Sequence, residues 1–437
     1  MADRLLFPPT TVADMRQRGW DAPDFVYVSG DAYVDHPSFG AAVIVRTLEA
    51  AGYRVAVLAQ PHWKNANDFK RFGRPNYGFL VSSGVIDSMV NHYTAAKRRR
   101  SSDVYTPGGK AAKRPDRAVN VYCHLIREAY GDIPIAIGGV EASLRRFAHY
   151  DYWDDAVRPS ILVDSGADLL MFGMGERSIL VTADWMSRGA PVWECAKMRG
   201  VCFLSPAPMR GSIEIPSFED CVKSKKKYGE AFLVQYNEQD PIRGHAISQR
   251  HGDAYLVQTI PDMPLNRDEL DHSYTLPYQR TWHPDYDALG GVPAIEEVQF
   301  SIAHTRGCFG SCSFCAITFL QGRIVTTRSH ESVLEEAKAI TQMPNFKGYI
   351  HDVGGPTANF RRAACDKQLK FGTCAGRQCL FPKPCPNMVV DHTDYIKLLR
   401  EIRSLPKVKK VFVRSGLRYD YIMADKSDAF LRELCQY

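Results

Sequence analysis

Three cysteines in the last third of the chain carry the clearest chemical signal. Cys308, Cys312 and Cys315 have the spacing C-x3-C-x2-C and directly follow a stretch that is predicted to be a strand. Three thiolates on one short loop can bind three irons of a cubane [4Fe–4S] cluster and leave the fourth iron open to another ligand. Gly307 and Gly310 would let the backbone pass close to such a cluster. Structural zinc sites more often use paired C-x2-C units, so the spacing favours iron and sulfide.

A second group of four cysteines lies in a loop that is rich in glycine and proline. Its members are Cys365, Cys374, Cys379 and Cys385, spaced C-x8-C-x4-C-x5-C. Four thiolates would close a metal site, which would then be structural or would transfer electrons. Zinc and an auxiliary [4Fe–4S] cluster are both chemically suitable, and free thiols are the third alternative. The sequence therefore predicts a second metal site without identifying its metal.

The composition is that of a soluble globular protein. The chain has 437 residues, of which 45% are hydrophobic and 24% charged. It has no run of about 18 apolar residues, and its first residues lack the apolar region of a secretory signal. We therefore expect no membrane partner and a cytoplasmic location, where clustered cysteines serve as metal ligands rather than disulfides. The five scattered cysteines, which are interpreted as small buried hydrophobes, are Cys123, Cys195, Cys202, Cys221 and Cys435.

The net charge of +6 is concentrated in one segment. Residues 97–117 contain eight Lys and Arg residues and two Asp residues, and this difference equals the whole excess. The run predicts a basic loop that is either solvated or able to bind phosphate groups. It is the only local support for a nucleic-acid partner.

Regular elements must position this chemistry, and residues 1–190 alternate between strand and helix patterns. Buried strand patterns at residues 24–29 and 54–59 flank a helical pattern at residues 39–51, which favours a parallel pair of strands. The pattern recurs with strands at residues 77–81, 133–137 and 169–172 and a helix at residues 120–130. The sequence thus predicts a doubly wound, Rossmann-like α/β domain over residues 1–190.

The next hundred residues change character before the alternation returns. Residues 191–290 have short runs and frequent prolines, so we expect a small β-containing insert and linker, with strands at residues 230–236 and 254–258. From residue 291 onward the pattern is again that of β/α units. The expected strands lie at residues 297–302, 349–353 and 410–414, and the expected helices at residues 329–343, 391–404 and 427–435.

The first cysteine group resembles the radical S-adenosylmethionine (SAM) superfamily, because Phe314 completes the pattern C-x3-C-x-aromatic-C after a strand. The resemblance implies that the open iron chelates the amino and carboxylate groups of SAM and that Phe314 lies near the adenine. Gly354 and Gly355 end the second expected strand, where the superfamily has a Gly-Gly-Glu-like motif that receives the SAM amino group. Here Pro356 replaces the acidic residue.

A wider set of motifs is similar to the YgiQ-type (UPF0313) group of radical SAM proteins. These motifs lie at residues 24–39, 137–146, 173–176 and 414–420, so the resemblance covers essentially the whole chain. It implies an N-terminal domain with the fold of cobalamin-binding domains. The cobalamin signature D-x-H-x-x-G is not met around His36, and cobalamin binding through this histidine is therefore not expected.

The resemblance also implies an activity and the partners that it needs. Residues 291–437 are expected to form a radical SAM (β/α) partial barrel that is C-terminally truncated, because only three β/α units are predicted there. The implied enzyme cleaves SAM reductively to a 5′-deoxyadenosyl radical that acts on a substrate the resemblance does not identify. Its electrons would come from a low-potential, flavodoxin- or ferredoxin-like donor. The alternatives are a non-catalytic [4Fe–4S]-binding fragment and an RNA-modifying radical SAM enzyme.

Overall fold

The computed structural model describes residues 4–437, which form two compact units. Unit 1 runs to Glu238 and resumes over Gly244–Asp262 and Pro277–Ile295. Unit 2 consists of Gln239–Arg243, Met263–Leu276 and Glu296–Tyr437. Among the described residues, no helix is both long enough and apolar enough to cross a membrane.

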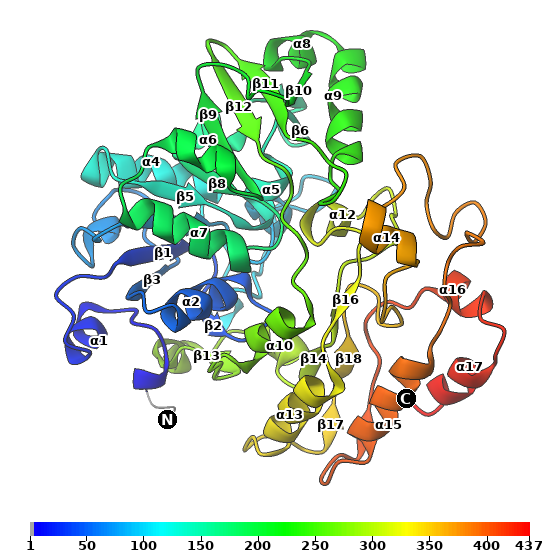
Figure 1. The fold of residues 1–437 in the computed structure, drawn as a ribbon. Coiled ribbons are helices and arrows are strands. Elements are labelled where there is room, and N and C mark those ends of the chain that lie inside the picture. Colours follow the sequence, from blue (N-terminus) through cyan, green and yellow to red (C-terminus); the bar gives the residue numbers. More distant parts are fainter. Residues whose placement is uncertain (1–3) are drawn as a thin grey trace. The chain divides into compact units, whose positions relative to one another are not determined.

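Unit 1 is built on a nine-stranded sheet with the order β10-β11-β12-β9-β8-β5-β4-β1-β3 (Figure 1). Its parallel part is β3-β1-β4-β5-β8, so the strand order reverses between β1 and β4, as in doubly wound sheets. Nearly every residue of these strands is buried, which suits parallel strands because both of their faces are covered. The five strands are β1 (Phe25–Ser29), β3 (Val55–Ala59), β4 (Gly78–Ser82), β5 (Ile135–Ile137) and β8 (Leu169–Met171).

The helices that connect these strands pack in pairs, α2 against α7 and α4 against α6. The alternation of strands and helices predicted between residues 24 and 172 is confirmed. The helices of this region are η1 (Arg4–Leu6), α1 (Val12–Gln17), α2 (Gly40–Ala50), η2 (Asp68–Lys70), α3 (Ser88–His92), η3 (Pro107–Gly109), α4 (Ala118–Tyr130), α5 (Gly139–Leu144), α6 (Ile161–Ser165) and α7 (Glu176–Ser187). Its short strands are β2 (Val34–Asp35), β6 (His149–Asp151) and β7 (Ala156–Arg158).

The stretch expected as an insert and linker contributes four strands to this same sheet. These are β9 (Val201–Ser205), β10 (Ile213–Ile215), β11 (Ile247–His251) and β12 (Ala254–Gln258). Strands β9, β11 and β12 join by antiparallel pairing, and β9 pairs with β8, so the sheet continues without a break across residue 190. Other elements are η4 (Val192–Lys197), α8 (Phe218–Lys223), α9 (Lys225–Asn237), β13 (Thr281–Trp282), η5 (Pro284–Leu289) and α11 (Ile295–Val298).

One strand prediction in this stretch is wrong, because residues 230–236 lie within helix α9. Ser224 caps the helix by accepting a hydrogen bond from the backbone N–H of Lys227, and this cap favours a helix that begins at Lys225. Only Ala231 of the helix is buried, while Phe232 and Leu233 are exposed. The alternation read from the sequence therefore did not report a buried face.

Unit 2 contains short parallel strands that are covered by two helices. Strand β14 (Ser301–Ala303) pairs with β18 (Asp352–Gly354), and β17 (Tyr349–Ile350) pairs with β19 (Lys410–Val411). Their buried residues form one core with helices α13 (His330–Thr341) and α15 (Thr393–Arg403), centred on Ile302, Val353 and Leu399. The remaining elements are α10 (Arg267–Thr275), β15 (Thr305–Arg306), α12 (Ile317–Leu320), β16 (Thr326–Thr327), α14 (Asp366–Phe371), α16 (Tyr419–Met423) and α17 (Ala429–Leu434).

The three strands predicted after residue 291 are present in shortened form. The first was predicted to begin at residue 297, but helix α11 occupies residues up to Val298 and the strand starts at Ser301. The two glutamates of this helix are exposed. The alternation of apolar and polar residues there therefore reflects the exposed side of a helical turn and not a strand.

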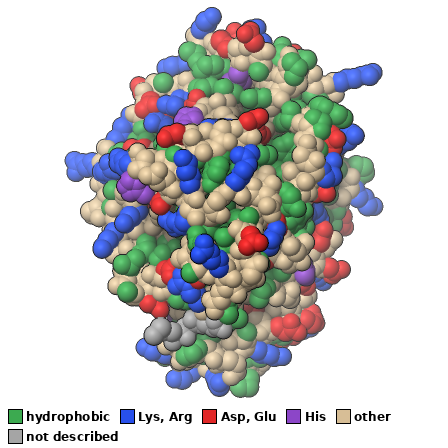
Figure 2. Space-filling view, turned by 90° about the vertical axis from the view of Figure 1, so that its left-hand side faces the viewer, with side chains coloured by type: hydrophobic (Ala, Val, Ile, Leu, Met, Phe, Trp, Pro, Cys, Tyr) green, Lys and Arg blue, Asp and Glu red, His purple; other side chains and the backbone are tan. Residues whose placement is uncertain are grey.

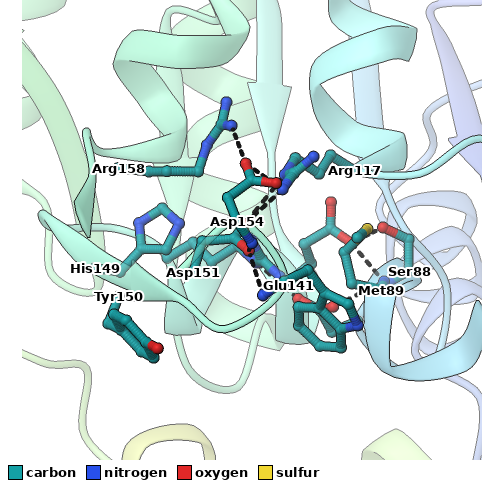
Figure 3. A network of polar contacts seen from close by, with 12 residues as sticks. Ser88, Met89, Arg117, Glu141, His149, Tyr150, Asp151, Asp154 and Arg158 are labelled. Carbon is teal, nitrogen blue, oxygen red and sulfur yellow. Dashed lines mark hydrogen bonds and ion pairs between the residues drawn. The ribbon is translucent and has the colours of Figure 1, made fainter. Parts of the chain in front are cut away.

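A buried polar network joins the loops around α3, α4 and α5 in unit 1 (Figure 3). The carboxylate of Asp151 accepts hydrogen bonds from Arg117 at 2.9 Å and from the backbone N–H of Asp154 at 3.1 Å. Arg145 reaches the same carboxylate at 3.3 Å, and Glu141 accepts from the backbone N–H of Ser88 at 2.7 Å. Burial alone would raise the pKa of Asp151, but the Asp154 N–H and the Arg117 guanidinium lower it to about 2.

This network predicts a pH-dependent contribution of Asp151 to stability. A carboxyl whose pKa is depressed on folding stabilises the native state above its unfolded pKa of about 3.9 and loses that effect as the pH falls toward 2. We expect D151N to lower the free energy of unfolding by about 1 kcal/mol more at pH 6 than at pH 3, because about half of the effect is lost over this range. Urea unfolding of both proteins between pH 6 and pH 3 measures the difference.

The control is D154N, which removes a more exposed carboxylate from the same network. Exposed ion pairs contribute about 0–1 kcal/mol, so its effect on unfolding is expected to be small at every pH. A difference between wild type and D151N that stays constant with pH would contradict the role assigned to the Asp151 charge.

Candidate functional site

The first three cysteines lie on one loop between β15 and α12. The antiparallel pair of β15 and β16 closes the base of this loop, and the backbone N–H of Cys308 donates to the Gly322 carbonyl at 3.0 Å. The thiols of Cys308, Cys312 and Cys315 are free and partly exposed. The backbone N–H of Cys315 donates to the Cys312 carbonyl at 3.0 Å, which folds the last two cysteines into one turn.

Two glycines permit the close path of this loop. Gly307 has a φ of +80°, and a Cβ there would overlap the carbonyl oxygen of Ile324. A Cβ on Gly310 would lie 2.8 Å from an Arg418 guanidinium nitrogen and 3.2 Å from the Cys308 sulfur. A side chain at either position would therefore displace the loop or the groups next to its thiols.

Polar groups from different parts of unit 2 contact two of the three sulfur atoms. Arg418 Nη1 donates to the Cys312 sulfur at 3.1 Å, and the backbone N–H of Gly310 donates to the Cys308 sulfur at 3.4 Å. The Thr357 hydroxyl lies 3.2 Å from the same Cys308 sulfur. Burial raises the pKa of the Cys308 thiol, while Thr357 and Gly310 act in the opposite direction. At Cys308, Thr357 and Gly310 thus favour the charged thiolate, the form in which cysteine binds a metal.

Arg418 is held in place by its own contacts. Its Nε donates to Asp420 Oδ1 at 2.9 Å, and its backbone N–H donates to Asn359 Oδ1 at 2.9 Å. The arginine lies in the 414–420 motif that follows β19, so the end of the third strand is connected to the cysteine loop.

The glycine pair lies at the carboxyl end of β18, next to the end of β14. A Cβ on Gly355 would overlap the Thr305 side chain and lie 2.9 Å from the Thr305 carbonyl oxygen. A Cβ on Gly354 would overlap Ser415 and the Asp352 carboxylate. That carboxylate accepts the backbone N–H of Ser415 at 3.1 Å. Close packing of the strand ends thus requires small residues at both positions.

A buried histidine behind these strand ends was not identified from the sequence. His304 Nε2 lies 3.0 Å from the Ala358 carbonyl oxygen, and Arg361 donates to His304 Nδ1 at 3.2 Å. Burial lowers the pKa of His304 well below its usual value, and the positive charge of Arg361 acts in the same direction. The histidine is therefore neutral with its proton on Nε2. Its position directly after a strand was the only signal in the sequence.

The remaining expected SAM residue, Phe314, lies between the second and third cysteines with 90% of its side chain exposed. Its ring is therefore free of packing against the core of unit 2. The exposed position leaves the ring accessible to a planar ligand.

The second cysteine group forms a loop that begins at the N-terminus of α14. Gln368, on this helix, has its side-chain nitrogen 3.7 Å from the Cys379 sulfur, and the Cys385 N–H donates to the Cys379 carbonyl at 2.8 Å. Burial raises the pKa of the Cys379 thiol to about 11, the Arg323 guanidinium lowers it, and the other three thiols of the group raise it. The other three thiols of the group therefore lie within electrostatic reach of the Cys379 thiol.

Within residues 4–437, no group of three or more His, Cys, Asp or Glu side chains converges so as to hold a single metal ion. The three-cysteine and four-cysteine groups stay predictions as metal sites.

The basic segment at residues 97–117 is partly neutralised within unit 1. Arg114 is fully buried and forms ion pairs with Asp31 at 2.5 Å and Asp103 at 3.0 Å. Arg117 pairs with Asp151 and Asp154. On the face shown in Figure 2, Lys and Arg side chains are interspersed with Asp and Glu. Part of the positive charge of this segment thus stabilises the fold.

Comparison with known proteins defines the class of this chain. The family model described as Radical SAM N-terminal matches residues 7–301. A UPF0313 protein from Clostridium botulinum (strain ATCC 19397 / Type A) is 56% identical over 433 residues, and one from Clostridium perfringens (strain SM101 / Type A) is 56% identical over 434 residues. Each alignment covers 99% of this chain, which spans 67% and 66% of the respective relatives. The chain belongs to the UPF0313 family, and the predicted family membership is confirmed.

Solved structures show a weaker similarity. The radical S-adenosylmethionine methyltransferase TsrM from Kitasatospora setae, with a tryptophan substrate and a SAM analogue bound, aligns with a TM-score of 0.46 and 15% identity. The alignment covers 91% of this chain and 56% of TsrM.

Gly355, directly after β18, provides a test of the close packing at the strand ends. We expect G355A to destabilise unit 2 by about 1–3 kcal/mol, because the added methyl group overlaps Thr305 and forces the strand ends apart. The matched control is G416A, in the segment after β19, where a Cβ meets no heavy atom within 4 Å. Urea unfolding measures both variants, and equal stability would contradict the close approach of Gly355 to Thr305.

Proposed function

We propose that this chain is an iron–sulfur enzyme of the radical SAM class, in which Cys308, Cys312 and Cys315 bind one [4Fe–4S] cluster. The observation that carries the proposal is the loop itself, with three free thiols and hydrogen-bond donors aimed at two of their sulfur atoms. A cubane with three protein ligands keeps one iron open, and the loop provides three thiolates. Membership of the UPF0313 family supports the same class.

The chain's own residues fit such a cluster. When bound, the cluster supplies the electron that cleaves SAM to methionine and a 5′-deoxyadenosyl radical. Arg418 and the Gly310 N–H would stabilise the thiolates and make the cluster easier to reduce, since hydrogen bonds and positive charge offset the added electron. Thr357, beside Cys308, would act in the same way.

The same proposal assigns residues to SAM. Gly354 and Gly355 would receive its amino group. They lie at the end of β18, which pairs with β14, and the cysteine loop follows β14 in the sequence. Phe314 would stack on the adenine with its exposed ring. Strands β14, β18 and β19 would form the first part of a partial barrel, whose active site lies at the carboxyl ends of its strands.

Unit 1 would have the fold of a cobalamin-binding domain without binding cobalamin. In doubly wound sheets a ligand binds where the strand order reverses, here at the ends of β1 and β4. Buried Asp31 follows β1 and accepts the backbone N–H of Val85 at 2.6 Å. Arg114 pairs with Asp31 and donates to the Ser83 carbonyl at 3.0 Å, so the carboxylate after β1 is already engaged by a side chain of this unit.

The proposed partners are SAM and a low-potential electron donor resembling flavodoxin or ferredoxin. The substrate that receives the radical is not assigned. The proposal includes no nucleic-acid partner. Arg114 and Arg117 of the basic segment already form ion pairs within unit 1.

Removal of the first three cysteines tests the cluster and SAM together. We expect C308A/C312A/C315A to lose about four irons per chain relative to wild type after anaerobic reconstitution. In the reduced wild-type protein, SAM is expected to change the EPR signal of the cluster, and 5′-deoxyadenosine is expected as a product. The control is C435A: Cys435 is exposed, unlike the other four scattered cysteines and contrary to the interpretation from the sequence, and its loss should leave the protein like wild type.

Two results would count against this proposal. Equal iron in wild type and the triple variant would remove the cluster assignment. A changed EPR signal without 5′-deoxyadenosine would leave SAM binding and remove the catalytic step.

Arg418 offers a separate test of the cluster environment. We expect R418Q to make the reduction potential of the cluster more negative, because a positive charge and a hydrogen bond to a thiolate are lost. An EPR-monitored redox titration measures the potential. The control is R414Q, four residues earlier, since Arg414 is exposed and pairs with Glu297. Equal shifts in both variants would mean that the Cys312 contact does not tune the cluster.

A further inference from the structure

The four-cysteine loop is fastened to the rest of unit 2 at several points. Thr373, one residue before the second cysteine, donates its backbone N–H at 2.6 Å and its hydroxyl at 2.7 Å to Asp240. Arg243 donates to the Thr373 carbonyl at 2.6 Å. Val389, beyond the last cysteine, donates its N–H to the Ala364 carbonyl at 2.8 Å, so both ends of the loop are joined. The loop therefore has a defined path.

The guanidinium of Arg323 fixes the part of this loop between its second and third cysteines. It donates to the Cys374 carbonyl at 2.9 Å and to the Arg377 carbonyl at 3.0 Å. A positive charge is thus held beside a group of thiols, where it would offset the negative charge of several thiolates. Phe371 and Phe381 of this segment are exposed, whereas Leu380 is buried.

The two cysteine loops share a small apolar core. Phe309, Phe360 and Tyr421 are its largest members, and Cys308 of the first loop and Cys379 of the second loop both pack against it. The rings of Phe309 and Phe360 stack with their centroids 3.7 Å apart.

A direct hydrogen bond also joins the two loops. The Gln378 side chain donates to the backbone carbonyl of Ser311 at 3.1 Å. Gln378 directly precedes Cys379, and Ser311 directly precedes Cys312. The shared core and this bond make the two cysteine groups neighbours within unit 2.

We propose that Cys365, Cys374, Cys379 and Cys385 bind a second [4Fe–4S] cluster next to the first. A cubane offers four separate irons to four thiolates, so the sulfur atoms need not converge on one point as they would around a single zinc ion. Four protein ligands saturate this cluster, and SAM has no open iron there. Its role is to hold the loop and carry electrons. The proposal does not depend on SAM binding at the first site.

Reconstitution of the full-length chain with iron and sulfide under anaerobic conditions tests this site. We expect about eight irons in wild type, and about four in both C308A/C312A/C315A and C365A/C374A/C379A/C385A. Mössbauer spectra should identify [4Fe–4S] clusters in both variants. Only C365A/C374A/C379A/C385A, which retains the first site, should keep an EPR signal that responds to SAM. C435A is the control for loss of an exposed thiol and should keep about eight irons.

A smaller variant covers the case in which removal of all four cysteines prevents folding. C374A/C385A leaves Cys379 against the apolar core and is expected to keep the circular dichroism of wild type with about four irons. The proposal is overturned if C308A/C312A/C315A is folded but holds no iron, or if this variant holds one zinc in place of iron. If only the first site fails, C308A/C312A/C315A would instead hold about four irons and C365A/C374A/C379A/C385A would hold none.

Discussion

The hydrogen bond from Arg418 to the sulfur of Cys312 connects the two parts of the chain on which the proposed chemistry depends. Several thiolates on a short loop repel one another, and a fixed guanidinium reduces that repulsion more effectively than water does. Asp420 and Asn359 hold Arg418 in place. The cysteine loop is thus shaped by a residue more than a hundred positions further along the chain.

The contacts at the strand ends extend this arrangement. Gly355 lets β18 approach Thr305, directly before the cysteine loop, and Asp352 binds the backbone after β19. Neutral His304 is also held in place close to these strand ends, because both of its ring nitrogens take part in hydrogen bonds. The site is therefore rigid at its base, while Phe314 at its surface is exposed.

The sequence predicted the elements of the site that depend on local chemistry. The cysteine spacing, the glycines of the loop and the strand that ends at Gly354 could be recognised because each depends on near neighbours. The contributions of Thr357, Arg418 and His304 could not, since they depend on contacts between distant positions of the chain. For the fold, buried parallel strands such as β1 were predicted correctly because they form continuous apolar runs.

The errors in the fold have a common physical cause. Alternation at residues 230–236 and residues 297–298 suggested strands, yet these segments are helical, and Ala231 is their only buried residue. Strand pairing depends on a partner, and no local pattern shows which edge is available. For the same reason, the continuity of the sheet across β8 and β9 could not be seen in the sequence.

The division of the chain has a practical consequence for anyone who dissects it. Unit 2 takes two short pieces, Gln239–Arg243 and Met263–Leu276, from within the sequence of unit 1. A fragment that starts at Glu296 would lack the Asp240 carboxylate that holds Thr373, and also Tyr274, whose ring lies 4.0 Å from the Arg328 guanidinium. Unit 2 therefore cannot be separated by a single cut, and an expressed fragment must include the part of unit 1 that its pieces interrupt.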